Sequence, residues 1–233
     1  MADFTPPQRK KNALDNNKLK LSTPCPTAPG KNSSLVWGVY SNNPRLTVYT
    51  GDPEDSGERN GYGAIKANLD GPVFYTFLEI CKKIIAGPPD KKLKIDLLNF
   101  TFFGGKRSEA PVVTQEVWVG KDNDGSVWIS VIAPNRPKIK FVFSNNTSYN
   151  LYHGDGTPLS KEEMSNLFAL GYVNMLSNLT ANVMVEEYAD IVPKQQNGGG
   201  YQGRGNGGGN GGYNNNSNYN KGAPQGSSGD IPF

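Results

Sequence analysis

Large aromatic and basic side chains stand out of phase with the aliphatic residues in three short β-rich runs of the chain. Trp118 and Trp128 alternate with valine and isoleucine, and Lys138 and Lys140 alternate with isoleucine and phenylalanine. Side chains two positions apart in a strand share a face, so these four residues should lie opposite the aliphatic faces. Indole rings stack on unpaired bases and ammonium groups attract phosphates, so the pattern is typical of a single-stranded nucleic-acid site.

Other segments supply candidates for the same chemistry. The predicted stacking residues are Tyr49, Tyr62, Phe102, Trp118 and Trp128, and the predicted phosphate-binding residues are Arg45, Lys66, Lys106, Arg107, Lys138 and Lys140. Stacking stabilises binding by roughly 1–3 kcal/mol per base whatever the base, so we expect little sequence preference and strong salt dependence. The alternative for each tryptophan is packing beneath the second helix or the N-terminal segment.

Few residues suit catalysis or metal binding. His153 is the sole histidine, and Cys25 and Cys81 are too few to complete a zinc site with it. No nucleophile elbow and no phosphate-binding Walker loop occur in the sequence. We therefore predict a protein without enzymatic activity, cofactor or metal. A metal-dependent nuclease that uses an acidic loop with Asp52 and Asp55 stays open as an alternative.

Composition divides the chain into four parts. The forty residues from 194 to 233 hold 13 of the 28 glycines and almost no aliphatic residues, so they cannot bury enough apolar surface to fold. We predict an N-terminal arm at 1–33, broken by prolines, and a single folded domain at 34–193. A disordered linker rich in glycine and asparagine at 194–229 then leads to a short tip at 230–233.

Charge and hydropathy restrict the class of protein further. The net charge is +3, of which +2 lies in the tail, so any nucleic-acid site must rest on a local basic surface. No apolar run is long enough to span a bilayer, and the N-terminus lacks the apolar core of a secretory signal. We expect a cytoplasmic protein with reduced cysteines and no membrane partner.

The elements that must position these residues are mostly short strands. Several short runs have the pattern of strands, and turn sequences rich in Asn, Asp, Gly and Pro separate them. These runs are 35–40, 45–50, 62–69, 93–103, 112–119, 126–132 and 138–143. Asn42 to Pro44 should form a hairpin turn. In the third run Ile65, Ala67 and Leu69 should face the core.

Two helices complete the prediction. The first begins after Asp70 and ends at Gly87, and the second begins at Ser160 with Glu163 in a capping box, with a break near Gly171. A helix between two groups of strands favours an oligonucleotide-binding (OB) fold. This is a mainly β, five-stranded Greek-key barrel, here with extra strands and a C-terminal helix. A β-sandwich would also satisfy the number of strands.

The C-terminus resembles that of bacterial-type single-stranded DNA-binding proteins. The resemblance rests on the terminal residues Asp230, Ile231, Pro232 and Phe233 and on the spacer rich in Gly, Asn and Gln before them. The length and composition look more like a bacteriophage member, which would act in the host cytoplasm. The resemblance implies an OB-fold domain that coats single-stranded DNA in replication, recombination and repair, with a tip that recruits a DNA polymerase, helicase, nuclease or recombination protein. The family tip usually carries several acidic residues, whereas Asp230 here is alone.

Two other functions stay open at this point. A single-stranded RNA-binding protein of the same architecture would show the same residues, because nothing in the sequence reads a 2′-hydroxyl. A non-nucleic-acid adaptor protein would use the aromatic face as a protein interface. A homo-oligomer is possible in each case.

Overall fold

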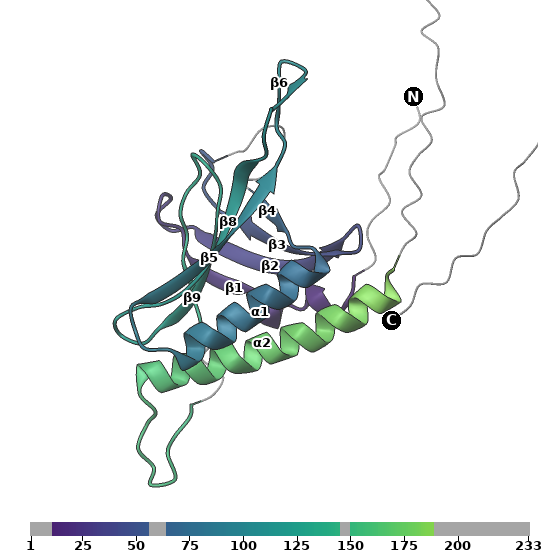
Figure 1. Cartoon of the computed structure of the whole chain (residues 1–233). Helices are drawn as coiled ribbons and strands as arrows, with labels where there is room; N and C mark the ends of the chain where they lie inside the picture. Colours follow the sequence, from purple (N-terminus) through teal and green to yellow (C-terminus); the bar gives the residue numbers. More distant parts are fainter. Residues whose placement is uncertain (1–10, 56–63, 145–149, 189–233) are drawn as a thin grey trace, which may run out of the picture. The chain divides into compact units, whose positions relative to one another are not determined.

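The computed structural model describes residues 11–55, 64–144 and 150–188 (Figure 1). Its contacts divide the chain into a unit at Met1–Ile191 and a second unit at Val192–Phe233, and all described residues belong to the first. This part is mainly β with two helices, as predicted from the sequence. The tip residues, the linker and Tyr62 lie outside the described residues.

One antiparallel sheet is built from the first four strands. Its order is β1-β2-β3-β4, with β1 (Leu21–Pro24), β2 (Asn32–Tyr40), β3 (Asn43–Tyr49) and β4 (Ala64–Asn68). The predicted hairpin between β2 and β3 is confirmed, but its turn is at Ser41 and Asn42, whose φ angles are 50° and 60°, and not at Asn42 to Pro44, because Asn43 and Pro44 already pair in β3. Two successive positive φ angles give the turn the twist that a two-residue hairpin needs.

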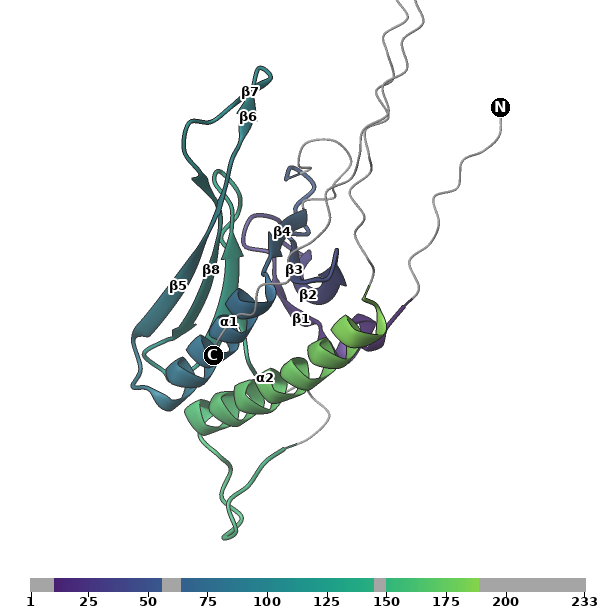
Figure 2. The same cartoon turned by 45° about the vertical axis from the view of Figure 1, so that its right-hand side comes forward.

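The second antiparallel sheet has the order β10-β9-β8-β5. Its strands are β5 (Lys91–Asn99), β8 (Val112–Lys121), β9 (Val127–Ile132) and β10 (Phe141–Val142). Beyond the ends of β5 and β8 a small ribbon, β6 (Phe102–Phe103) with β7 (Lys106–Arg107), projects from the sheet (Figure 2). The expected strand at 138–143 is shorter than predicted, because only its last part pairs with β9.

Helix α1 (Gly71–Ala86) begins where the sequence places it. The Asp70 side chain accepts a hydrogen bond from the backbone N–H of Val73 at 3.1 Å, and Pro72 lies in the first turn. Phe74, Phe77 and Ile84 are buried on one side of the helix. Their spacing of three and seven residues fixes which face of α1 meets the core.

Helix α2 (Lys161–Glu186) has the predicted capping box between Ser160 and Glu163. The predicted break near Gly171 is wrong, because the helix is continuous through that residue. One glycine costs a helix only about 1 kcal/mol relative to alanine, and the buried residues Tyr172 and Leu176 hold α2 on the core across this point. Figures 1 and 2 show α1 and α2 side by side.

The N-terminal segment differs from the solvated arm expected at 1–33. Within its described part, β1 pairs with β2 and two short 3-10 helices, η1 (Ala13–Asp15) and η2 (Asn17–Leu19), precede it. Leu14 and Leu19 are buried in the core, and the Tyr172 hydroxyl donates to the Leu19 carbonyl at 2.6 Å. The leucines follow neither helical nor strand periodicity, so the sequence gives no sign of their burial.

The two four-stranded sheets do not merge into one closed barrel within the described residues. β4 and β5 are separated by α1, and no hydrogen-bonded pairing joins β1 to β10, although these two strands contact each other. The aliphatic faces of both sheets and of α1 and α2 share a single core, which includes Leu46, Ile65, Val119 and Ile129. The faces opposite this core carry the described site residues of the two four-stranded sheets, whereas Phe102, Lys106 and Arg107 lie in the separate β6–β7 ribbon.

Candidate nucleic-acid interface

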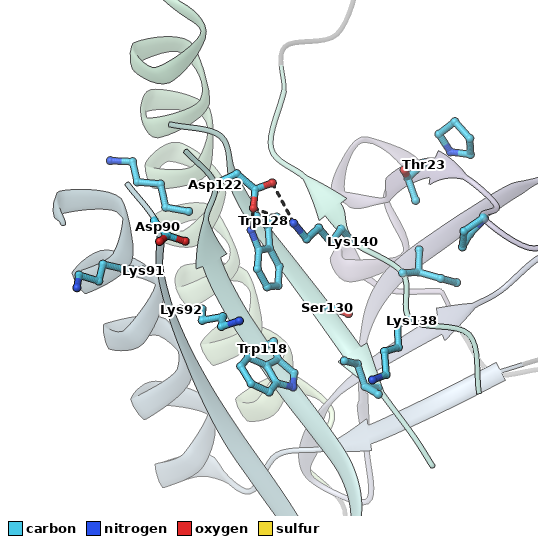
Figure 3. A pocket seen from close by; sticks show the side chains of 15 residues that line it. Thr23, Asp90, Lys91, Lys92, Trp118, Asp122, Trp128, Ser130, Lys138 and Lys140 are labelled. Carbon is cyan, nitrogen blue, oxygen red and sulfur yellow. Dashed lines mark hydrogen bonds and ion pairs between the residues drawn. The ribbon is translucent and has the colours of Figure 1, made fainter. Parts of the chain in front are cut away.

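A groove of about 750 Å³ lies on the outer face of the second sheet. Figure 3 shows Trp118 and Trp128 along it, with Lys92 on one side and Lys138 and Lys140 on the other. Their positions follow from the strand pairing, because Trp118 pairs with Ser130 and Gly120 pairs with Trp128. The two tryptophans and two lysines, which the alternation of the sequence assigns to the outer faces, therefore line one groove.

Trp118 is the partly exposed aromatic ring of the groove. Its indole N–H donates to Glu116 Oε2 at 2.8 Å, which fixes the orientation of the ring. The ammonium groups of Lys92 and Lys94 lie 5.8 and 5.5 Å from the ring centre. This arrangement supplies a stacking surface for a base and cations for the phosphates beside it.

Trp128 lies deeper than the sequence pattern implies, with only 7% of its surface exposed. Its indole N–H donates to Asp122 Oδ1 at 2.9 Å, and the Lys140 ammonium lies 4.7 Å from the ring centre. Trp128 is thus on the predicted face but forms part of the floor of the groove. A base could stack on this ring only if the side chain of Lys140 moved aside.

Ion pairs reduce the free positive charge of the surface. Lys140 pairs with Asp122 at 2.8 Å, and Lys94 pairs with Asp96 at 2.9 Å and with Glu116 at 3.0 Å. Hydrogen bonds that the Lys94 ammonium donates to Asp96 and Glu116 raise the pKa of Lys94 above its ordinary value. Hydrogen bonds from Trp118 and then Lys94 lower the pKa of Glu116. Both groups therefore stay charged at neutral pH.

Lys91, Lys92 and Lys138 of the groove are available for other anions, and Lys92 also lies 5.8 Å from the ring centre of Trp118. Among the described residues neither Lys92 nor Lys138 forms an ion pair, and both are exposed on the rim of the groove. A phosphate that approached either ammonium would not have to displace a carboxylate. Lys92 and Lys138 are therefore candidates for phosphate contacts on the two sides of Trp118.

The other predicted site residues lie on two further surfaces. Arg45, Tyr49 and Lys66 are on the outer face of the first sheet, where the Arg45 guanidinium stacks 3.7 Å from the ring centre of Tyr40. Phe102, Lys106 and Arg107 are in the β6–β7 ribbon, and they do not line the groove. The ten predicted residues that the structure describes thus do not form one continuous site.

Sequence reasoning missed several residues of the groove. Lys92 precedes the predicted start of its strand by one residue, and extending the alternation of Leu93 and Ile95 backwards would have placed it on the Trp118 face. Thr23 and Pro24 line the groove from β1, in the segment expected to be a solvated arm. No local signal in the sequence relates them to the second sheet.

Asp55, from the acidic loop considered as a metal site, forms contacts within the fold. Asp55 forms an ion pair with Arg136, with a 2.7 Å hydrogen bond from Nη2, and accepts a hydrogen bond from Thr50. In residues 11–55, 64–144 and 150–188 no group of three or more His, Cys, Asp or Glu side chains is placed to hold a metal ion. Both cysteines are free and buried.

Comparisons with known proteins do not assign the chain to a family. No known family, curated protein or solved structure matches it. In the part of the chain that the structure describes, neither helix is long and apolar enough to cross a membrane.

Proposed function

We propose that this protein binds single-stranded DNA along the groove on the outer face of the second sheet, without strong sequence preference. The observation that carries the proposal is the partly exposed indole of Trp118 with two lysine ammonium groups within 6 Å of its ring centre. Double-stranded DNA hides the faces of its bases inside the stack. A flat ring among cations therefore suits an unpaired strand better than a duplex.

The size and charge of the groove support the same ligand. Its volume of about 750 Å³ lies in the range of a small-ligand pocket, and it is open to the surface. The unpaired Lys92 and Lys138 on opposite rims would hold the phosphates of a strand whose bases lie against Trp118. The fold behind the groove is proposed to be an open form of the OB architecture, a Greek-key barrel, with α1 between its two groups of strands.

The C-terminal tip extends this proposal to partner proteins. Ile231, Pro232 and Phe233 form an apolar end on a long polar spacer, and Pro232 lowers the entropy cost of docking. We propose that the tip recruits a polymerase, helicase, nuclease or recombination protein to coated DNA during replication, recombination and repair. We propose that the protein comes from a bacteriophage and acts in the cytoplasm of a bacterial host.

Titration of the full-length chain with oligo(dT) at low salt tests the proposal through intrinsic tryptophan fluorescence. Binding should quench Trp118, while Trp37, which donates to Tyr172 within the core, should respond little. Trp118→Ala should weaken affinity by about 5- to 150-fold, the equivalent of one stacked base. Tyr75→Ala removes an exposed aromatic residue from α1 outside the groove and is the matched control.

Two results would contradict the proposal. One is absence of binding at low salt, and the other is an equal loss of affinity in the Trp118 and Tyr75 variants. Competition with an RNA oligomer of the same sequence separates the two nucleic acids. Stronger binding of RNA than of DNA would mean that the groove is an RNA-binding site.

A further inference from the structure

The second sheet ends in a long strand with an open edge. β5 spans nine residues and pairs with β8 on one side, and no strand among the described residues pairs with its other side. Figure 2 shows β5 at the margin of the sheet, next to β8. Leu93 and Leu98 are 38% and 60% exposed on this strand. An edge of this length offers unpaired backbone N–H and C=O groups to another strand.

The sequence of this edge is complementary to itself. From Lys92 to Leu98 it reads Lys-Leu-Lys-Ile-Asp-Leu-Leu, with Ile95 at its centre. In an antiparallel pairing of two copies about Ile95, Lys94 stands opposite Asp96 of the second copy. Leu93 stands opposite Leu97 in the same way. Opposite charges and apolar side chains that face each other across strands stabilise the pairing.

We propose that two copies of this chain associate through their β5 edges, in antiparallel register about Ile95. The partner is therefore a second copy of the same chain, and the contact is isologous, as a two-fold dimer requires. Each Lys94, which already pairs with Asp96 at 2.9 Å and with Glu116 at 3.0 Å in its own chain, gains a third carboxylate across the axis. The two copies together form one eight-stranded antiparallel sheet.

Neighbouring registers of the β5 pairing are less favourable than the register centred on Ile95. A pairing centred on Lys94 would place the two copies of that ammonium opposite each other, and one centred on Asp96 would do the same with two carboxylates. A pairing centred on Leu93 would put Lys92 opposite Lys94. Of the registers centred on residues 93 to 96, only the one about Ile95 avoids like charges in direct opposition and places Lys94 opposite Asp96.

Lysines on an edge strand often protect it from pairing. In the register about Ile95, however, Lys92 faces Leu98 of the second copy, where its alkyl chain can cover an exposed apolar side chain. The two-fold axis is perpendicular to the sheet, so the outer faces of both copies lie on the same side. The two Trp118 grooves would then form one surface. The association itself does not depend on what the grooves bind.

Disulfide trapping in the full-length chain tests both the edge and the register. Lys94→Cys and Asp96→Cys are made as separate single variants, and a mixture of the two is oxidised without nucleic acid. Residues directly opposite lie within disulfide reach, whereas diagonal neighbours at about 7–8 Å do not. The mixture should form a disulfide-linked dimer, and each variant alone should not. The wild-type chain is the control, since Cys25 and Cys81 are buried.

Light scattering provides an independent measurement of association. The wild-type chain should show twice the mass of one chain. Asp96→Lys should raise the dimer dissociation constant by about tenfold or more, because it places like charges opposite each other twice. Glu79→Lys makes the same charge change on α1, away from the edge, and should leave dimerisation unchanged.

Three results would overturn the proposal. The first is a wild-type chain that stays monomeric at millimolar concentration. The second is a dimer whose mixed cysteine variants do not cross-link. The third is cross-linking of either single variant by itself, which would mean a different register.

Discussion

The indole of Trp128 lies over Gly120, in the space that a side chain at position 120 would fill. A Cβ atom built on Gly120 would stand 2.6 Å from Cε2 of the Trp128 ring. The two residues are directly paired between β8 and β9, and because Gly120 has no side chain, the Trp128 ring can pack against its backbone. This pairing lets Trp128 lie flat in the floor of the groove, while Trp118 stays partly exposed.

The first prediction concerns this contact. Gly120→Ala should lower the free energy of unfolding by about 1–3 kcal/mol, because the methyl group overlaps the ring. Gly171→Ala is the control, since its Cβ meets no atom within 4 Å, and alanine in a helix should stabilise by about 0.5–1 kcal/mol. Urea denaturation measures both variants. Equal effects of the two substitutions would show that Trp128 does not need the space over Gly120.

The second prediction concerns charge on the rim of the groove. Lys138→Ala should lower affinity for oligo(dT) and reduce the slope of log K against log salt by about one, because one phosphate contact is lost. Lys82→Ala removes a lysine that pairs with Glu79 on α1, and this control should leave the slope unchanged. Titrations at several salt concentrations give the slopes. An unchanged slope for Lys138→Ala would remove this residue from the binding surface.

The third prediction concerns pH and the start of α2. Hydrogen bonds from the Ser160 hydroxyl and backbone N–H lower the pKa of Glu163 below its ordinary value of 4.5. A carboxyl group with a lowered pKa stabilises the fold above its ordinary pKa. This contribution is lost as the pH falls through the folded-state value.

Ser160→Ala should therefore cost about 1 kcal/mol of stability at neutral pH. Its difference from the wild-type chain should become smaller in acid, where Glu163 is protonated in both proteins. Denaturation at neutral pH and near pH 3 measures this change. Ser22→Ala, at an exposed position on β1, is the control. A difference that is the same at both pH values would show that Glu163 does not contribute to the cap.

The fourth prediction concerns the tip. Removal of residues 230–233 should leave the melting temperature unchanged, because the described core is built from residues between Leu14 and Val183. We expect affinity for single-stranded DNA to stay equal or rise, and binding of a polymerase or nuclease partner to fall. Melting curves, oligo(dT) titration and pull-down of such a partner measure the three effects. A large fall in melting temperature would instead show that the tip contributes to the stability of the folded domain.

Local sequence signals were sufficient to predict most of the helices and strands. Asp70 with Pro72, and Ser160 with Glu163, mark the starts of the two helices because capping is settled within one turn of chain. The alternation of Ile65 and Ala67 assigns the buried face of β4 in the same way, because strand periodicity depends only on neighbouring residues. The mainly β class with two helices follows from these signals.

The sequence by itself determined which faces of the late strands carry aromatic and basic residues, since side chains in a strand alternate whatever surrounds them. Only the tertiary structure decided which of these residues meet. Strand order and register put Trp118, Trp128 and Lys138 around one groove, and they left Arg45 on a different sheet. The depth of Trp128 and the burial of Leu14 and Leu19 also depend on partners distant in sequence, which no local pattern records.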